Sequence, residues 1–111
     1  MLLQIPKIAG KSQFVVTGDF NATEDTNVYR ILTGREEVGS FKLFDGRYIS
    51  KNGHFGGIST WNAFKELEPN RKIDYVFVGD NVKVLEHGVL SDRWEGLWAS
   101  DHLPVLAEIL F

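Results

Sequence analysis

Three short runs of β-branched and aromatic residues constrain the fold of this chain more than any other feature. The runs cover residues 14–17, 73–78 and 103–111, and each has the length of one buried strand. Pro104 stands among the first residues of the third run, where a strand tolerates proline. Residues 81–90 alternate valines less regularly, which predicts an edge strand. The chain is therefore expected to be rich in strands.

One segment has the features of a longer helix. Thr23 can cap a helix, and the acids Glu24 and Asp25 suit the positive end of a helix dipole. We expect this helix to end near Leu32, because Gly34 follows it. Strands with one helix among them predict an α+β domain.

The remaining segments predict turns and loops. Asp45-Gly46 is typical of a hairpin turn, and the glycine-rich residues 51–57 predict a loop. His54 lies in that loop, and a plain surface position is favoured over contact with a substrate. His87 precedes Gly88 and is interpreted as a turn residue.

Composition narrows the class of protein. A length of 111 residues predicts one domain, and the absence of cysteine excludes disulfides, thiolate metal sites and a cysteine nucleophile. The net charge of −3, without a basic run, argues against a nucleic-acid binder held by phosphate contacts alone. No apolar run approaches the ~20 residues that span a bilayer, so no membrane span is expected. The lack of cysteine and of a signal peptide favours the cytoplasm.

Polar groups follow or interrupt the three strand-like runs. Asp19 and Asn21 come directly after the first run, which is compatible with an Asx turn or with a functional site. Asp74 stands in an otherwise apolar run, where a charge is costly unless it is paired or faces water. Asp101 and His102 open the third run and could form an ordinary ion pair. Together these groups predict a carboxylate-rich site for Mg²⁺ or Mn²⁺, since hard cations prefer oxygen ligands.

The strings GDFNAT, IDYVFV and SDHLPV, in this order, resemble the C-terminal motifs of the endonuclease/exonuclease/phosphatase superfamily, the deoxyribonuclease-like fold. The segment STWNAF at 59–64 also resembles bacterial members. The resemblance runs from about residue 14 to the C-terminus. It implies half of a two-sheet, four-layered α/β sandwich, with one mixed β-sheet and a helix on its outer face.

The resemblance also implies roles for individual residues. Asp19 would orient or deprotonate the attacking water and contribute to the metal site. Asn21 would contact the water or a phosphate oxygen. His102 would stabilise charge on the phosphate, with Asp74 accepting a hydrogen bond from it. Asp101 would support the metal.

Members of this superfamily are about twice as long, and their N-terminal half brings an Asn and a Glu that hold the metal. The chain is therefore expected to be a C-terminal portion, residues 1–111, with the N-terminal half absent. None of its glutamates stands in the family's ligand context. We expect a homodimer formed through the sheet face, or association with the missing half, with weak metal binding and little turnover. The residues expected on that face are Phe14, Val16, Tyr75, Phe77, Val105 and Ala107.

Two tryptophans are further candidates for substrate binding. Trp61 lies in the STWNAF segment, and Trp98 precedes the Asp101-His102 pair. Either indole could stack on a base or a sugar, although packing of a long loop is equally compatible with Trp98.

The expected function is hydrolysis of a phosphoester, with nucleic acid among the possible substrates. Phosphodiesters and phosphomonoesters both remain open. The alternatives are a catalytically inactive subdomain that dimerises or binds a partner, and an unrelated small α+β binding protein. In the last case Asp19, Asp74 and His102 would lie far apart.

Overall fold

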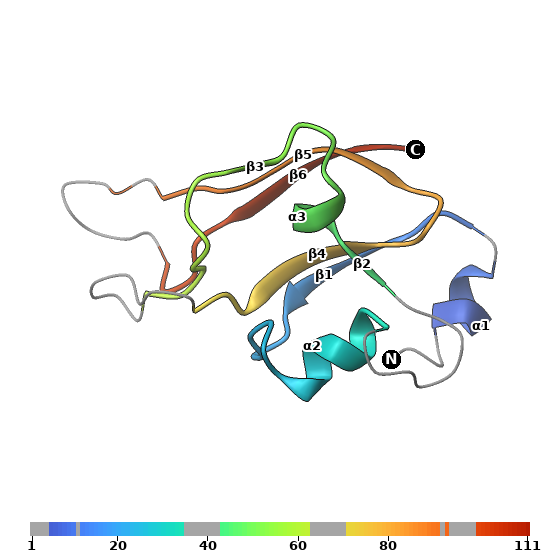
Figure 1. The fold of residues 1–111 in the computed structure, drawn as a ribbon, viewed down its shortest axis with the longest axis horizontal. Helices are drawn as coiled ribbons and strands as arrows, with labels where there is room; N and C mark the ends of the chain where they lie inside the picture. Colours follow the sequence, from blue (N-terminus) through green and yellow to red (C-terminus); the bar gives the residue numbers. More distant parts are fainter. Residues whose placement is uncertain (1–4, 11, 35–42, 63–70, 92, 94–99) are drawn as a thin grey trace.

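A computed structural model of the chain describes residues 5–10, 12–34, 43–62, 71–91, 93 and 100–111. Short strands dominate it, as the sequence predicts (Figure 1). The elements in chain order are α1 (Ile5–Ala9), β1 (Val15–Asp19), α2 (Asn27–Leu32), β2 (Phe44–Asp45), α3 (Gly46–Ile49), β3 (His54–Phe55), β4 (Asp74–Val78), β5 (Lys83–Val89) and β6 (Val105–Leu110).

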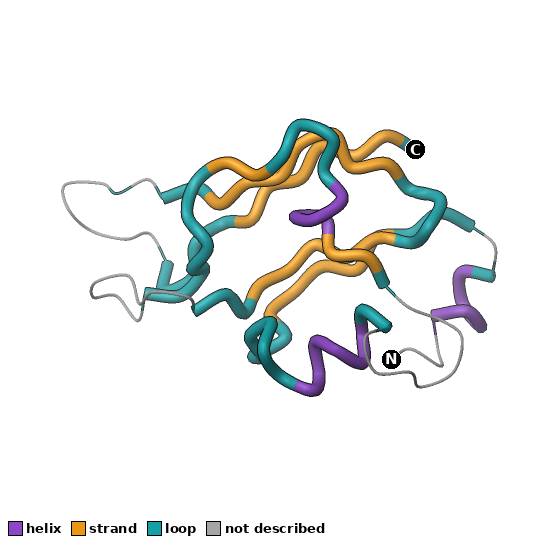
Figure 2. The backbone as a smooth tube through the Cα atoms, viewed as in Figure 1, coloured by secondary structure: helices purple, strands orange, loops and turns teal. Residues whose placement is uncertain are grey.

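The strands form two sheets of three strands each. The first, called sheet A, has the order β1-β4-β2 and is antiparallel throughout. The second, called sheet B, has the order β3-β5-β6 and is mixed, because β3 runs parallel to β5 and β6 antiparallel to it. In the view of Figure 2 the strands of sheet B lie above those of sheet A, and α2 lies below sheet A. The α+β class and the mixed sheet are confirmed, and the antiparallel sheet A accompanies the mixed one.

The hydrophobic core lies on both faces of sheet A. On one face Tyr75 and Phe77 pack against Tyr29 and Leu32 of α2, and the rings of Tyr75 and Phe77 stack with centroids 5.1 Å apart. On the other face Val78 packs against Val82, which directly precedes β5, and against Val84 of β5. Because strand side chains alternate between faces, β4 supplies both clusters.

This packing corrects the expected bare face. Tyr75 and Phe77 are buried by the chain's own helix, and Phe14 and Val16 pack against the same cluster. Ala107 of β6 packs between the sheets. Leu106 and Leu110 of β6 and the following Phe111 are exposed, as are apolar side chains elsewhere on the chain, such as Ile8 and Val28.

β5 is the central strand of sheet B and not an edge strand. It pairs with β6 along its length, and β3, only two residues long, pairs with its other side inside the segment predicted to be a loop. The register is irregular between Val84 and Glu86, which marks a bulge. This bulge explains why the alternation of apolar residues slips there.

The helix α2 begins later than the sequence predicts. Thr26 is its cap, and the Thr26 hydroxyl accepts a hydrogen bond from the Tyr29 N–H at 3.3 Å. The hydroxyl of Thr23 instead bonds the carboxylate of Asp25, within the turn that precedes the helix. Both threonines are possible caps, and the structure selects the second.

Asp45 begins a helical turn and does not form the predicted hairpin. Its carboxylate accepts a hydrogen bond from the Arg47 N–H at 3.0 Å and so caps α3. Its other oxygen accepts from the hydroxyl of Tyr29 at 2.8 Å and lies 3.3 Å from the ammonium of Lys72. Asp45 and Lys72 are both almost completely buried. Burial lowers the pKa of Lys72, and the nearby carboxylate of Asp45 opposes that shift.

His87 is a core residue of β5 and not a turn residue. It is fully buried, and its Nδ1 lies 2.9 Å from Nδ1 of His54. Since His54 Nε2 must donate to the Gly57 carbonyl at 2.7 Å, His54 Nδ1 accepts and His87 Nδ1 donates. Burial lowers the pKa of His87 to about 4 and keeps the ring neutral.

Among the described residues, no helix is long and apolar enough to cross a membrane.

Candidate active site

The pairing of β1 with β4 places two aspartates opposite one another. Asp19, the last residue of β1, is the register partner of Asp74, the first residue of β4. A hydrogen bond of 2.9 Å from the Phe20 N–H to the Ile73 carbonyl extends this pairing past the strand ends. In an antiparallel pair, opposed residues point to the same face, so both carboxylates serve one site.

His102 joins these carboxylates from the segment that precedes β6. Its Nδ1 lies 2.7 Å from an oxygen of Asp74, and its Nε2 lies 3.7 Å from Asp19. One ligand atom from each of Asp19, Asp74 and His102 lies within 4.8 Å of the others, and we call these residues the carboxylate–histidine trio. Their convergence confirms the prediction that residues far apart in the sequence meet at one sheet end. It also excludes the reading of the three strings as chance motifs in an unrelated fold.

Asn21 fixes the orientation of Asp19. Its backbone N–H donates to one oxygen of Asp19 at 2.7 Å, while the second oxygen faces His102. The φ angle of Asn21 is 50°, a left-handed conformation that asparagine adopts more readily than most residues. The Asx turn and the functional site, weighed as alternatives from the sequence, therefore occur together.

A groove runs past the trio. Its volume is about 390 Å³, within the range of small-molecule sites, and it is open to solvent. It lies between sheet A and the start of β6, and its lining comprises Thr17, Gly18, Asp19, Asp74, Tyr75, Val76, Leu103, Pro104 and Val105. A ligand in this groove would contact both carboxylates.

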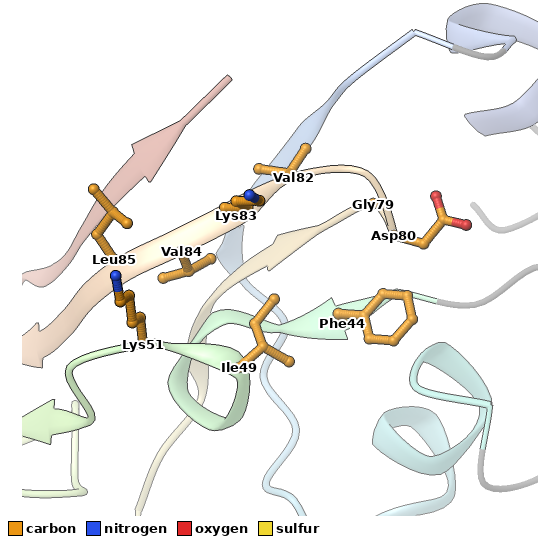
Figure 3. Close-up of a pocket in the computed structure, with 9 residues that line it drawn as sticks. All are labelled: Phe44, Ile49, Lys51, Gly79, Asp80, Val82, Lys83, Val84 and Leu85. Atoms are coloured by element: carbon orange, nitrogen blue, oxygen red, sulfur yellow. The ribbon is translucent and has the colours of Figure 1, made fainter.

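A second cavity lies at the opposite end of β4 from Asp74, and Figure 3 shows the side chains around it. Its wall is mostly apolar and contains none of the trio. The lining residues are Phe44, Ile49, Lys51, Gly79, Asp80, Val82, Lys83, Val84 and Leu85. The two carboxylates of the trio border the groove and not this cavity.

The other candidates have different surroundings. Asp101 has an oxygen 4.0 Å from Nε2 of His102, so it borders the trio. Trp61 pairs with His102 through its backbone, and the guanidinium of Arg71 lies 5.4 Å from the centroid of its ring. Trp98 lies outside the described residues.

Thr60 and Asn62 had no role in the sequence analysis, yet both are buried beside the trio. Thr60 bonds to the backbone at Asp74, and Asn62 bonds to the backbone at Asp101. Their presence in the STWNAF segment was the available signal. A buried polar residue in a segment without periodicity cannot be told from an exposed one by sequence alone.

The comparisons with known proteins agree with this geometry. The sequence profile of the Endonuclease/Exonuclease/phosphatase family matches residues 2–102. The chain belongs to this family. No curated protein matches the chain significantly.

Solved structures of this family have the same fold over nearly all of the chain. An endonuclease/exonuclease/phosphatase from Bacteroides vulgatus is 30% identical with a TM-score of 0.79, and the match covers 97% of this chain and 40% of that one. A mannosyl-6-phosphatase from Bacteroides thetaiotaomicron is 25% identical with a TM-score of 0.76, covering 98% and 42%. A conserved protein from Enterococcus faecalis, described as functionally unknown, is 25% identical with a TM-score of 0.80, covering 98% and 40%. The chain thus spans about two fifths of the structures that it matches.

Some of the side-chain oxygens at the site are suited to bind a hard divalent cation. The carboxylates of Asp19 and Asp101 lie on the Nε2 side of His102, and carboxylate oxygens are the ligands that Mg²⁺ and Mn²⁺ prefer. Asp74 is less suited to bind metal, because one of its oxygens is engaged with His102 Nδ1 at 2.7 Å. Among the described residues, the ligand atoms that converge closely enough for one ion belong to Asp19, Asp74 and His102, and Asp101 borders this group.

The hydrogen bond from His102 to Asp74 raises the pKa of His102, and partial burial opposes the shift. In the metal-free chain, Asp74→Asn is expected to lower this pKa, because the substitution removes the negative charge. A pKa raised by folding means that the pair stabilises the chain at low pH and loses that contribution as the pH rises through the raised value. An NMR titration of His102 measures the shift, with Glu108→Gln on β6 as the control. An equal pKa in wild type and Asp74→Asn would contradict this account.

Proposed function

We propose that the chain supplies the water-orienting and phosphate-contacting residues of a metal-dependent phosphoester hydrolase. The observation that carries the proposal is the imidazole of His102 held between Asp74 and Asp19 at the edge of an open groove. Membership of the Endonuclease/Exonuclease/phosphatase family supports the reaction class.

His102 is suited to stabilise negative charge on a phosphate. Asp74 accepts a hydrogen bond from the protonated Nδ1 of His102 and thereby orients the ring. The other ring nitrogen, Nε2, then lies on the side of Asp19. Asp74 raises the pKa of His102 and so favours the imidazolium, in which Nε2 also carries a proton. Because Nε2 lies 3.7 Å from Asp19, longer than a hydrogen bond, this N–H is available to a phosphate oxygen. A hydrogen-bond donor that is already oriented before the reaction binds the phosphate oxygen more strongly as negative charge develops on it in the transition state.

Asp19 is suited to orient or deprotonate the attacking water. One of its oxygens is held by the Asn21 N–H, and the other faces the same space as His102 Nε2. The carboxylate is half-exposed, so water reaches it. A bound Mg²⁺ or Mn²⁺ would neutralise phosphate oxygens and lower the pKa of a bound water.

The substrate is proposed only as a phosphoester. The mannosyl-6-phosphatase among the similar structures supports a sugar phosphate monoester as one candidate. The net charge of the chain is −3, which repels a polyanion such as a nucleic acid. A nucleic-acid substrate would therefore need favourable contacts at the site itself.

A second candidate function is association without turnover. It is favoured by the exposed apolar side chains of Leu106 and Leu110, which flank the exposed Glu108 on β6 at the edge of sheet B. The two-fifths coverage of the similar structures also favours it. An edge strand with apolar side chains readily pairs with another chain, most simply a second copy.

The chain is accordingly expected to form a homodimer through β6 at tens of micromolar. Leu106→Glu and Leu110→Glu should each shift the chain toward monomer, because both side chains are about half-exposed on the same face of β6. Light scattering measures the mass, and Val28→Glu on α2 serves as the control, because Val28 is also about half-exposed but lies away from β6. A monomeric wild-type chain at these concentrations would exclude this mode of association.

A hydrolysis assay separates the two candidates. The chain is incubated with Mg²⁺ or Mn²⁺ and either bis-p-nitrophenyl phosphate or p-nitrophenyl phosphate. The hydrolase proposal predicts slow release of nitrophenol that EDTA abolishes and Asp19→Asn lowers. Release that is equal in Asp19→Asn or insensitive to EDTA contradicts it, and no release favours association alone.

A further inference from the structure

Residues 59–62 are hydrogen-bonded to the segments of Asp74 and His102, and they bury polar side chains. Thr60 and Asn62 are fully buried, and Ser59 is nearly so. A buried polar side chain costs free energy unless it is hydrogen-bonded. The partners of these side chains therefore identify what the segment holds in place.

The hydroxyl of Thr60 holds the backbone at the start of β4. Its oxygen accepts hydrogen bonds from the N–H groups of Ile73 at 3.0 Å and Asp74 at 3.2 Å. A hydroxyl oxygen has two acceptor lone pairs, so these two bonds use both of them. The main chain at the start of β4 is thus held by the Thr60 hydroxyl.

The backbone of the same segment holds the residues on either side of His102. The Thr60 carbonyl accepts from the Leu103 N–H at 2.7 Å. The Asn62 N–H donates to the Asp101 carbonyl at 2.8 Å, and its side-chain amide donates to the Ser100 carbonyl at 3.0 Å. Thr60 is therefore bonded to the Asp74 segment through its side chain and to the His102 segment through its main chain.

We propose that Thr60 is a positioning residue, whose hydroxyl sets the carboxylate of Asp74 at hydrogen-bonding distance from His102. The reason is geometric, because Thr60 bonds directly to the backbone of Asp74 and to the residue that follows His102. Its consequence for turnover rests on the proposed function, in which Asp74 orients His102. Catalysis is sensitive to displacements of ~1 Å in such pairs.

The test compares two substitutions at the same position. Thr60→Val keeps the shape of the side chain but cannot accept the two N–H groups, whereas Thr60→Ser keeps the hydroxyl. The readout is the downfield proton on Nδ1 of His102 in metal-free, substrate-free chain. We expect this signal in wild type and in Thr60→Ser, and its loss in Thr60→Val. Thr60→Ala also lacks the hydroxyl oxygen and replaces Thr60→Val if that variant does not fold. The His102 signal should be lost in Thr60→Ala as well.

A purely structural role for Thr60 would give a different result. It would lower the melting temperature of the variants without removing the His102 signal from those that fold. The proposal is overturned if a folded Thr60→Val or Thr60→Ala retains the signal, or if Thr60→Ser loses it.

Kinetics provide the second readout. In a form that turns over substrate, Thr60→Val should lower kcat by at least ~10-fold with KM within ~2-fold of wild type, while Thr60→Ser stays within ~3-fold. Equal rates in wild type and Thr60→Val would overturn the catalytic consequence. If wild type shows no hydrolysis in any form, the proposed function fails, whereas the proton signal still decides the role of Thr60.

Discussion

Asp19→Asn is expected to lower kcat by at least ~10²-fold in any form of this protein that hydrolyses a phosphoester. Asparagine has nearly the same shape and can still accept the Asn21 N–H, so the loop should keep its conformation. It cannot take a proton from water and carries no charge for a metal ion. The loss should therefore appear in turnover and not in folding.

His102→Ala is expected to have an effect of similar size, because it removes the donor that lies beside Asp19 and Asp74. Initial rates at saturating Mg²⁺ measure both effects. Asp80→Asn is the matched control, since Asp80 is exposed at the far end of β4 and borders only the second cavity. If Asp19→Asn or His102→Ala retains near-normal turnover with metal present, the assigned role is wrong.

Asp45→Asn is expected to destabilise the folded chain by about 3–5 kcal/mol. The substitution leaves the ammonium of Lys72 buried without its countercharge, and both side chains are only 2% exposed. Asparagine has a single acceptor oxygen, so it also cannot keep the hydrogen bonds from both the Tyr29 hydroxyl and the Arg47 N–H. Chemical unfolding at constant pH measures the difference.

The double variant Asp45→Asn/Lys72→Met provides the internal control for this pair. It removes both charges, so it should be less destabilised than the sum of the two single variants. Asp80→Asn should change the free energy of unfolding by no more than ~0.5 kcal/mol. A cost for Asp45→Asn as small as that of Asp80→Asn would show that the buried pair does not stabilise the fold.

The sequence was sufficient to predict the main strands and the residues that meet at the site. Runs of β-branched residues identified β1, β4 and β6 to within a few residues, because these strands are short, apolar and bounded by turn residues. Asp19, Asp74 and His102 were singled out because each interrupts or ends such a run. Their convergence is confirmed by distances of 2.7 and 3.7 Å to the imidazole.

Other features depend on tertiary contacts that no local pattern contains. The sequence predicts an edge strand for β5, because a bulge between Val84 and Glu86 breaks its alternation, yet β3 and β6 flank it. α2 starts after Thr26 and not at Thr23, since both residues can cap and only packing of the following turn selects one. Asp45 forms no hairpin turn, because its carboxylate forms a buried salt bridge with Lys72.

The division of the strands into two sheets also escaped prediction. The side chains expected on a bare face, such as Tyr75 and Phe77, are covered by α2. The positioning contacts of Thr60 were equally hidden, because they join residues 13 and 14 positions away along the chain. Hydrogen bonds of this kind leave no periodic trace in a sequence.

The most direct test of the central claim is an amide and imidazole NMR titration of the chain with MgCl₂, followed by phenyl phosphate. If the trio is a metal-dependent phosphoester site, saturable shifts should centre on Asp19, Asp74, Asp101 and His102. The Mg²⁺-induced shifts should disappear in Asp19→Asn and persist in Asp80→Asn. Shifts centred on the cavity of Val82 and Val84, or no saturable response at the trio to either addition, would contradict the account.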